Sequence, residues 1–265
     1  MKKSTIIFLL ALINTCLIIE KSKAQIAPIQ NQYYFNSYIY NPAWLGKDNV
    51  QQVFLGIKKQ WIGVEGSPTI TTLTYEKALA SRVSFGGRII NINEGPIFNL
   101  SSQFTASYRI ELGLESYLNF GMSLGVLFNG FNASKLDDPD DPLVAQQNSS
   151  NLNFDGGVGF GYQNGKLNIG LSLPNFANPQ PFAQPTDKSR LSYSPWDYLI
   201  GSISYAFEPN LEWQFTPTLM YHYNKRFSNQ WETALKATYQ GSYYLGGILR
   251  KDAGFTLFGG LNIGD

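Results

Sequence analysis

Apolar and polar side chains alternate along most of the chain, most clearly from Ser116 to Phe128. One face of this run holds Leu118, Phe120, Met122, Leu124, Val126 and Phe128, and the other holds Tyr117, Asn119, Gly121, Ser123 and Gly125. A period of two is typical of a β-strand. The polar face carries small uncharged residues instead of the Lys and Glu of a strand that faces bulk water. The pattern therefore predicts a strand between lipid and a crowded, wet interior.

The same alternation recurs at residues 99–110, 154–163, 167–173, 199–207 and 211–223. We count about twelve candidate strands of roughly 8 to 15 residues, several of them long enough to cross a bilayer at a tilt. No segment after the first 24 residues has the period of an amphipathic helix. The fold class predicted is all-β, a transmembrane antiparallel up-and-down β-barrel formed by residues 50–265.

The connections between these strands are predicted to alternate in length. Short ones are expected at residues 77–80, 112–114, 164–165, 209–210 and 241–242, and longer ones at residues 61–67, 91–98, 132–153, 174–196 and 224–229. Outer-membrane barrels have short periplasmic turns and longer outer loops, so the first strand is expected to run outward from the periplasm. Aromatic residues near many strand ends, among them Trp61, Tyr75, Trp196 and Trp231, fit interfacial girdles or ordinary cross-strand packing.

Composition agrees with a membrane wall. Charged residues make up 15% of the chain and aromatic residues another 15%, whereas an average soluble domain has about 25% charged residues. The formal net charge is +1, from 20 basic and 19 acidic residues. Such a balance gives no basic field to attract nucleic acid, so we exclude nucleic acid as a partner.

The N-terminus has the features of a secretory signal peptide over residues 1–24. Lys2 and Lys3 precede an apolar stretch, and Ser22-Lys23-Ala24 offers small residues at the two positions that a signal peptidase reads. Cleavage after Ala24 is expected to leave residues 25–49 as a periplasmic N-terminal segment. Thr15 makes Cys16, the only cysteine, a poor lipidation site; the mature chain is then expected to lack disulfides and thiolate metal sites.

Two stretches outside the strands resemble the PorP/SprF family. Residues 32–46 contain an aromatic run that leads into Asn41-Pro42-Ala43-Trp44-Leu45-Gly46, similar to the family's Asn-Pro-Ala-x-x-Gly motif. Residues 58–69 are similar to its Arg-x-Gln-Trp-x-Gly-x-x-Gly-x-Pro-x-Thr signature, with Lys58 in the place of Arg and Ser67 where Ala is common. The motif residues that match, for which a structural role and a partner-contact role both stay open, are Asn41, Pro42, Gln60, Trp61, Gly63, Gly66, Pro68 and Thr69.

The resemblance implies an outer-membrane β-barrel of Bacteroidota that is associated with the type IX secretion system and, in some members, with gliding adhesins. It also implies about one more hairpin, which would make 14 strands. That agrees with the costly unpaired edge that a chain ending near Asp265 would leave in lipid, and we expect the last hairpin to be missing. From the residues, Gly63, Gly66 and Pro68 are expected to form a rigid outer turn with Trp61 at its base, and Asn41-Pro42 an extended or turned approach to the first strand.

Chemical candidates are few. His222, the only histidine, is more simply explained by an interior hydrogen bond than by catalysis. The run from Asp137 to Asp141 could bind calcium but lacks the spacing of a calcium loop, and Gly157–Gly161 lacks the helix that a dinucleotide loop needs. These glycines are better explained as making room inside the barrel or at a close strand approach. We therefore expect no enzyme activity, cofactor or metal.

The function predicted is that of a non-enzymatic outer-membrane partner of type IX secretion components, which assists export or surface attachment of cargo such as gliding adhesins. The alternative is a passive diffusion channel, in which Arg88, Arg109, Glu111 and Lys236 could supply a charged constriction or could pair with one another. A third possibility is a soluble β-sandwich, which would need no detergent.

Overall fold

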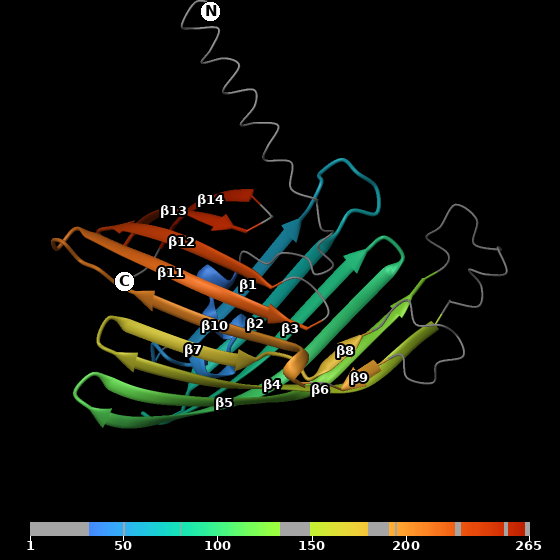
Figure 1. Cartoon of the computed structure of the whole chain (residues 1–265), viewed down its shortest axis with the longest axis horizontal. Helices are drawn as coiled ribbons and strands as arrows, with labels where there is room; N and C mark the ends of the chain where they lie inside the picture. The colour runs from blue at the N-terminus through green and yellow to red at the C-terminus, as the bar shows by residue number, and fades with distance from the viewer. Residues whose placement is uncertain are drawn as a thin grey trace, which may run out of the picture.

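The fold is one curved antiparallel sheet, shown by a computed structural model in Figure 1. The structure describes residues 32–49, 51–79, 81–132, 149–179, 191–193, 195–225, 229–251 and 254–262. The predicted signal peptide and the Asp137–Asp141 run lie outside these residues. None of the helices in the described ranges is long and apolar enough to cross a membrane.

The large sheet contains 12 strands in the order β1-β2-β3-β4-β5-β6-β7-β10-β11-β12-β13-β14, so chain neighbours are sheet neighbours throughout. Its strands are β1 (Gln51–Lys59), β2 (Thr69–Ala78), β3 (Val83–Glu94), β4 (Ile97–Gly113), β5 (Ser116–Phe131), β6 (Ser149–Asn164), β7 (Leu167–Leu173), β10 (Tyr198–Tyr205), β11 (Trp213–Asn224), β12 (Gln230–Tyr239), β13 (Tyr243–Arg250) and β14 (Gly254–Leu261). β8 (Ala177–Pro179) and β9 (Leu191–Tyr193) form a separate two-stranded sheet. The predicted all-β, antiparallel up-and-down architecture is confirmed, and it is not a pair of stacked sheets. In the described residues β1 and β14 are edge strands that do not pair with each other, so the sheet is not closed into a complete barrel.

The turns β2–β3, β4–β5, β6–β7, β10–β11 and β12–β13 gather at one rim of the sheet, which we call the short-turn rim (Figure 1). The predicted eight-residue connection at residues 91–98 is wrong. β3 and β4 stay paired as far as Glu94 and Ile97, so only Gly95 and Pro96 connect them. Gly95 has a φ of 55°, which a glycine adopts without steric cost and which permits this tight turn.

The two faces of the sheet differ as the alternation predicts. On β5 the side chains of Met122 and Leu124 are exposed on the convex face, whereas Asn119 and Ser123 are buried on the concave face. β1 and β13 to β14 show the same exposed apolar positions, including Val53, Leu55, Ile57, Leu245, Phe255 and Leu257. Such a band of apolar residues on the outside of an antiparallel wall is what a lipid-facing surface requires.

The concave side is filled by the chain's own N-terminal part, residues 32–48, which we call the inner segment. It contains the short 3-10 helices η1 (Gln32–Tyr34), η2 (Ser37–Ile39) and η3 (Pro42–Trp44), drawn in blue within the curve of the sheet in Figure 1. Tyr38, Ile39, Ala43, Trp44 and Leu45 are all buried. The sequence predicted this part only as a segment preceding the barrel; from Gln32 onward it lies against the interior wall.

The exposed convex face gives a direct test of lipid contact. Leu124 lies at the middle of β5 and is 62% exposed, and Leu114 lies in the turn before β5 and is 99% exposed. A charge at the bilayer midplane costs about 2–4 kcal/mol, and near the interface about 0–1 kcal/mol. We expect Leu124→Lys to lower the free energy of unfolding in lipid vesicles by the larger amount and Leu114→Lys by the smaller. Equal effects would contradict a lipid-facing convex wall.

Candidate functional site

The Asn-Pro-Ala-Trp motif lies in a groove of the wall whose floor consists of glycines. The groove glycines are Gly121 on β5, Gly159 and Gly161 on β6, and Gly170 on β7. A Cβ atom on Gly159 would lie 1.9 Å from Oδ1 of Asn41, and one on Gly121 would lie 2.2 Å from the carbonyl carbon of Pro42. Any side chain at these positions would displace the motif. The expectation that strand glycines make room in the interior is confirmed for Gly159 and Gly161, where the inner segment occupies the space. A Cβ on Gly157 would instead meet the backbone carbonyls of Leu173 and Pro174, which is the expected close approach of strands.

Asn41 links the inner segment to β6. Its side chain is 0% exposed. Its Oδ1 accepts a hydrogen bond from the Ala43 N–H at 2.9 Å, which makes it the N-cap of η3, and its Nδ2 donates to the Phe160 carbonyl at 3.1 Å. Pro42 occupies the first helical position, where a missing N–H is harmless. One amide thus starts the 3-10 turn and attaches it to the wall.

Side chains of the wall donate to the free backbone carbonyls of the inner segment. Arg88 donates to the carbonyl of Ile39, Ser172 to that of Tyr40 at 2.7 Å, Ser107 to that of Leu45 at 2.9 Å and Arg109 to that of Lys47 at 2.5 Å. Short 3-10 turns leave most of their carbonyls without partners inside the helix. The concave face supplies the partners, so the segment is buried without a loss of backbone hydrogen bonds.

Glu76 on β2 fastens the segment at two points. Its Oε1 accepts from the Asn36 side chain at 2.8 Å, and its Oε2 accepts from the Gly46 N–H at 3.2 Å. Asn36 also caps η2 by accepting from the Tyr38 N–H at 2.9 Å. One carboxylate therefore joins the beginning and the end of the inner segment to the same strand.

The Tyr38 hydroxyl extends this polar network from β2 to β4 and β5. It donates to Oγ1 of Thr105 on β4 at 2.7 Å, and Thr105 lies 2.7 Å from Oγ of Ser123 on β5. Burial raises the pKa of the Tyr38 hydroxyl above its ordinary value, and of Tyr40 likewise. Both phenols therefore keep their protons and remain hydrogen-bond donors.

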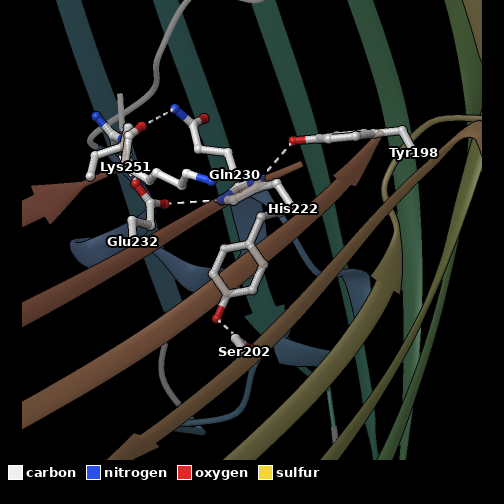
Figure 2. Close-up of polar contacts among 8 residues, drawn as sticks. Tyr198, Ser202, His222, Gln230, Glu232 and Lys251 are labelled. Atoms are coloured by element: carbon white, nitrogen blue, oxygen red, sulfur yellow. Dashed lines mark hydrogen bonds and ion pairs between the residues drawn. The ribbon is translucent and has the colours of Figure 1, made fainter. Parts of the chain in front are cut away.

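A second polar cluster lies where the inner segment begins (Figure 2). The Glu232 carboxylate, 1% exposed, lies 3.0 Å from Nε2 of His222 and accepts from Arg250 at 2.5 Å. Nδ1 of His222 lies 3.0 Å from the Tyr198 hydroxyl. The rings of Tyr33 and Tyr198 both stack on the imidazole, with centroids 6.2 Å apart in each case. The predicted hydrogen bond of His222 inside the barrel is confirmed.

The other motif residues form the connection between β1 and β2. Trp61 has a φ of 45° and is 67% exposed, and Gly63 and Gly66 have φ values of 93° and 70°. The Gln60 N–H donates to the Pro68 carbonyl at 2.9 Å, and Thr69 begins β2. The Gly66 carbonyl accepts from the Gly95 N–H at 2.7 Å, which ties this turn to the β3–β4 turn. The two motifs therefore lie apart: Asn41 and Pro42 inside the wall, and residues 60–69 in a surface turn.

The residues proposed for a constriction do not pair with one another. Arg88 and Arg109 donate to the inner segment, and Glu111 forms an exposed ion pair with Arg82 at 3.8 Å. Sequence reasoning missed Asn36, Glu76 and Glu232 as interior residues. Asn36 had a usable signal, because Asn is a preferred N-cap residue and Asn36 precedes a 3-10 turn as Asn41 does. In the described ranges, no group of three or more His, Cys, Asp or Glu side chains could hold a metal ion.

Comparison with known families adds the assignment that the geometry alone does not give. The family model described as type IX secretion system membrane protein PorP/SprF matches residues 22–265. The chain belongs to the PorP/SprF family. No curated protein matches it. The match covers the inner segment as well as the wall. In this PorP/SprF member the segment that fills the interior therefore belongs to the region that the family model describes.

The glycine groove gives a matched test of this packing. Gly159→Val is expected to force Asn41 away from β6 and to lower the free energy of unfolding by about 1–3 kcal/mol, as overpacked interiors do. Urea titration in vesicles, followed by tryptophan fluorescence, measures this change. Gly201→Val on β10 is the control, because a Cβ there has nothing within 4 Å. Equal stabilities of the two variants would show that the inner segment does not occupy the groove.

Proposed function

We propose that this chain is a non-enzymatic barrel of the outer membrane that assists export or surface attachment of cargo, such as gliding adhesins, as a partner of type IX secretion components. Membership of the PorP/SprF family supports the link to secretion. The short-turn rim would face the periplasm and the longer connections the cell surface, as in other outer-membrane barrels.

The filled interior is the observation that carries a partner role rather than a transport role. A diffusion channel needs an open lumen with a charged constriction. Here two inward-facing arginines, Arg88 and Arg109, hold the inner segment, and η3 packs against β4, β5, β6 and β7. A barrel with this interior offers its rims and loops to other proteins, not a path through its centre.

The exposed turn between β1 and β2 is a suitable contact for such a partner. Trp61 and Ile62 are 67% and 88% exposed, while the hydrogen bond between Gly66 and Gly95 fixes the turn's base. An apolar side chain presented on a fixed turn loses little conformational entropy when it binds. This supports a contact role for Trp61 and a structural role for Gly63, Gly66 and Pro68.

Conductance measurements test the closed interior. Wild-type protein reconstituted in planar bilayers is expected to show no steady open-channel current. Deletion of residues 32–46 should raise the conductance at least tenfold, because it removes the material that fills the lumen. A wild-type conductance equal to that of the deletion variant would favour the diffusion channel, and this conclusion stands on the wild-type record even if the deletion variant does not fold.

Affinity purification tests the partner role. Protein tagged within residues 133–148 and isolated from its own outer membrane is expected to bring down secretion components and cargo, identified by mass spectrometry. Trp61→Ala should reduce their recovery at least threefold without changing thermal stability. Leu114→Ala, in the β4–β5 turn at the short-turn rim, should leave recovery unchanged. Recovery of only those proteins that an unrelated tagged barrel also captures would contradict the proposal.

A further inference from the structure

The inner segment leaves a hollow on one side of the interior. η3 packs against β4 to β7, and on the other side a cavity of about 220 Å³ remains between the segment and β10 to β12. Tyr40 and Trp44 line it from the segment, and Ser204, Thr216 and Lys236 line it from the wall. The cavity is large enough for a small ligand or for one end of a larger one, and its walls offer hydroxyl groups beside aromatic rings.

Lys236 is the unusual member of this lining. It lies on the concave face of β12, in register with the buried Glu232, Ala234 and Thr238. Glu232, four residues earlier on the same face of β12, is fully engaged by His222 and Arg250. Among the residues that the structure describes, Lys236 has no hydrogen bond and no carboxylate within ion-pair distance. A partly buried ammonium group without a hydrogen bond or an ion-pair partner is costly.

A second ammonium group lies near the first. Lys47 lines the same cavity, with its Nζ 5.7 Å from the centroid of the Trp44 ring, and it is within electrostatic range of Lys236. In the described ranges it too has no carboxylate partner. Two like charges that share a small cavity repel each other, and an anion between them would relieve that repulsion.

The acidic residues of the lining do not fill this role. Glu76 is within electrostatic range of Lys47 but forms no ion pair with it, because both carboxylate oxygens accept from Asn36 and from the Gly46 N–H. Asp48 is exposed, at the point where the inner segment leads to β1 and the short-turn rim. It is within electrostatic range of Lys236, but it forms no ion pair with either lysine within 4 Å in the described part of the chain. Because Asp48 is an exposed member of the lining, we place the entrance of the cavity beside it, at the short-turn rim.

We propose that this cavity binds an oxyanion, a carboxylate or phosphate group, between Lys47 and Lys236. The Ser204 and Thr216 hydroxyls donate to the same group, and the ligand enters from the short-turn rim. Charge-assisted hydrogen bonds of this kind are about twice as strong as neutral ones. The site is independent of which proteins the barrel meets, so its absence would leave the proposed secretion role intact.

Two probes separate the chemical sources: inorganic phosphate for a phosphate group and citrate for a carboxylate. Full-length protein in detergent micelles is titrated with each at constant ionic strength against chloride. The preferred probe is expected to raise the melting temperature in a saturable way. It should also slow acetylation of Lys236 by acetic anhydride at least threefold, as read by peptide mass spectrometry.

Lys236→Met is expected to weaken binding of the probe at least tenfold, and Lys77→Met, at an exposed lysine of β2, to leave it unchanged. If Lys236→Met does not fold, protection of Lys236 from acetylation in the wild-type protein decides the matter alone. The proposal is overturned if neither probe slows acetylation more than chloride does. It is equally overturned if Lys236→Met keeps the full thermal shift.

Discussion

Hydrogen bonding of a polypeptide backbone inside a curved wall is the constraint on which the structure depends. The inner segment is too irregular to satisfy its own carbonyls, and burial makes each unsatisfied group expensive. Side chains of the wall supply the missing donors. Arginines donate to the carbonyls of Ile39 and Lys47, and serines donate to those of Tyr40 and Leu45. Several polar side chains of the concave face therefore serve as hydrogen-bond donors to the inner segment.

These hydrogen bonds also require that the backbone of the inner segment lie close to the wall. A peptide can be hydrogen-bonded by short serine side chains only when its backbone nearly touches the wall. The groove glycines permit this, since a Cβ on Gly161 would lie 2.7 Å from the Trp44 ring. Glycines inside strands weaken the sheet, and here that loss is offset by burial of Trp44, Tyr40, Ile200 and Met220 in one cluster.

The wall was predictable from the sequence because period-two alternation is a local signal. It predicted the number and order of the strands and the two faces of β5. The short β3–β4 turn was missed because Asn91 and Asn93, read as loop residues, in fact pair with Leu100 and Phe98. The site was less predictable. The family motif identified Asn41 and Pro42, but no periodicity marks the 3-10 turns of the inner segment, and its partners Glu76, Thr105 and Ser172 lie far along the chain.

Those sequence separations bear on how the protein is assembled. Asn41 is bonded to Phe160, 119 positions away, and Ser172 to Tyr40, 132 positions away. The first part of the chain to emerge from synthesis therefore has no finished binding surface until β6 and β7 are paired. Contacts between distant parts of a chain form slowly because the intervening loop must first be closed. The inner segment is consequently among the last parts of the molecule to reach its final place, although it precedes every strand of the wall in the sequence.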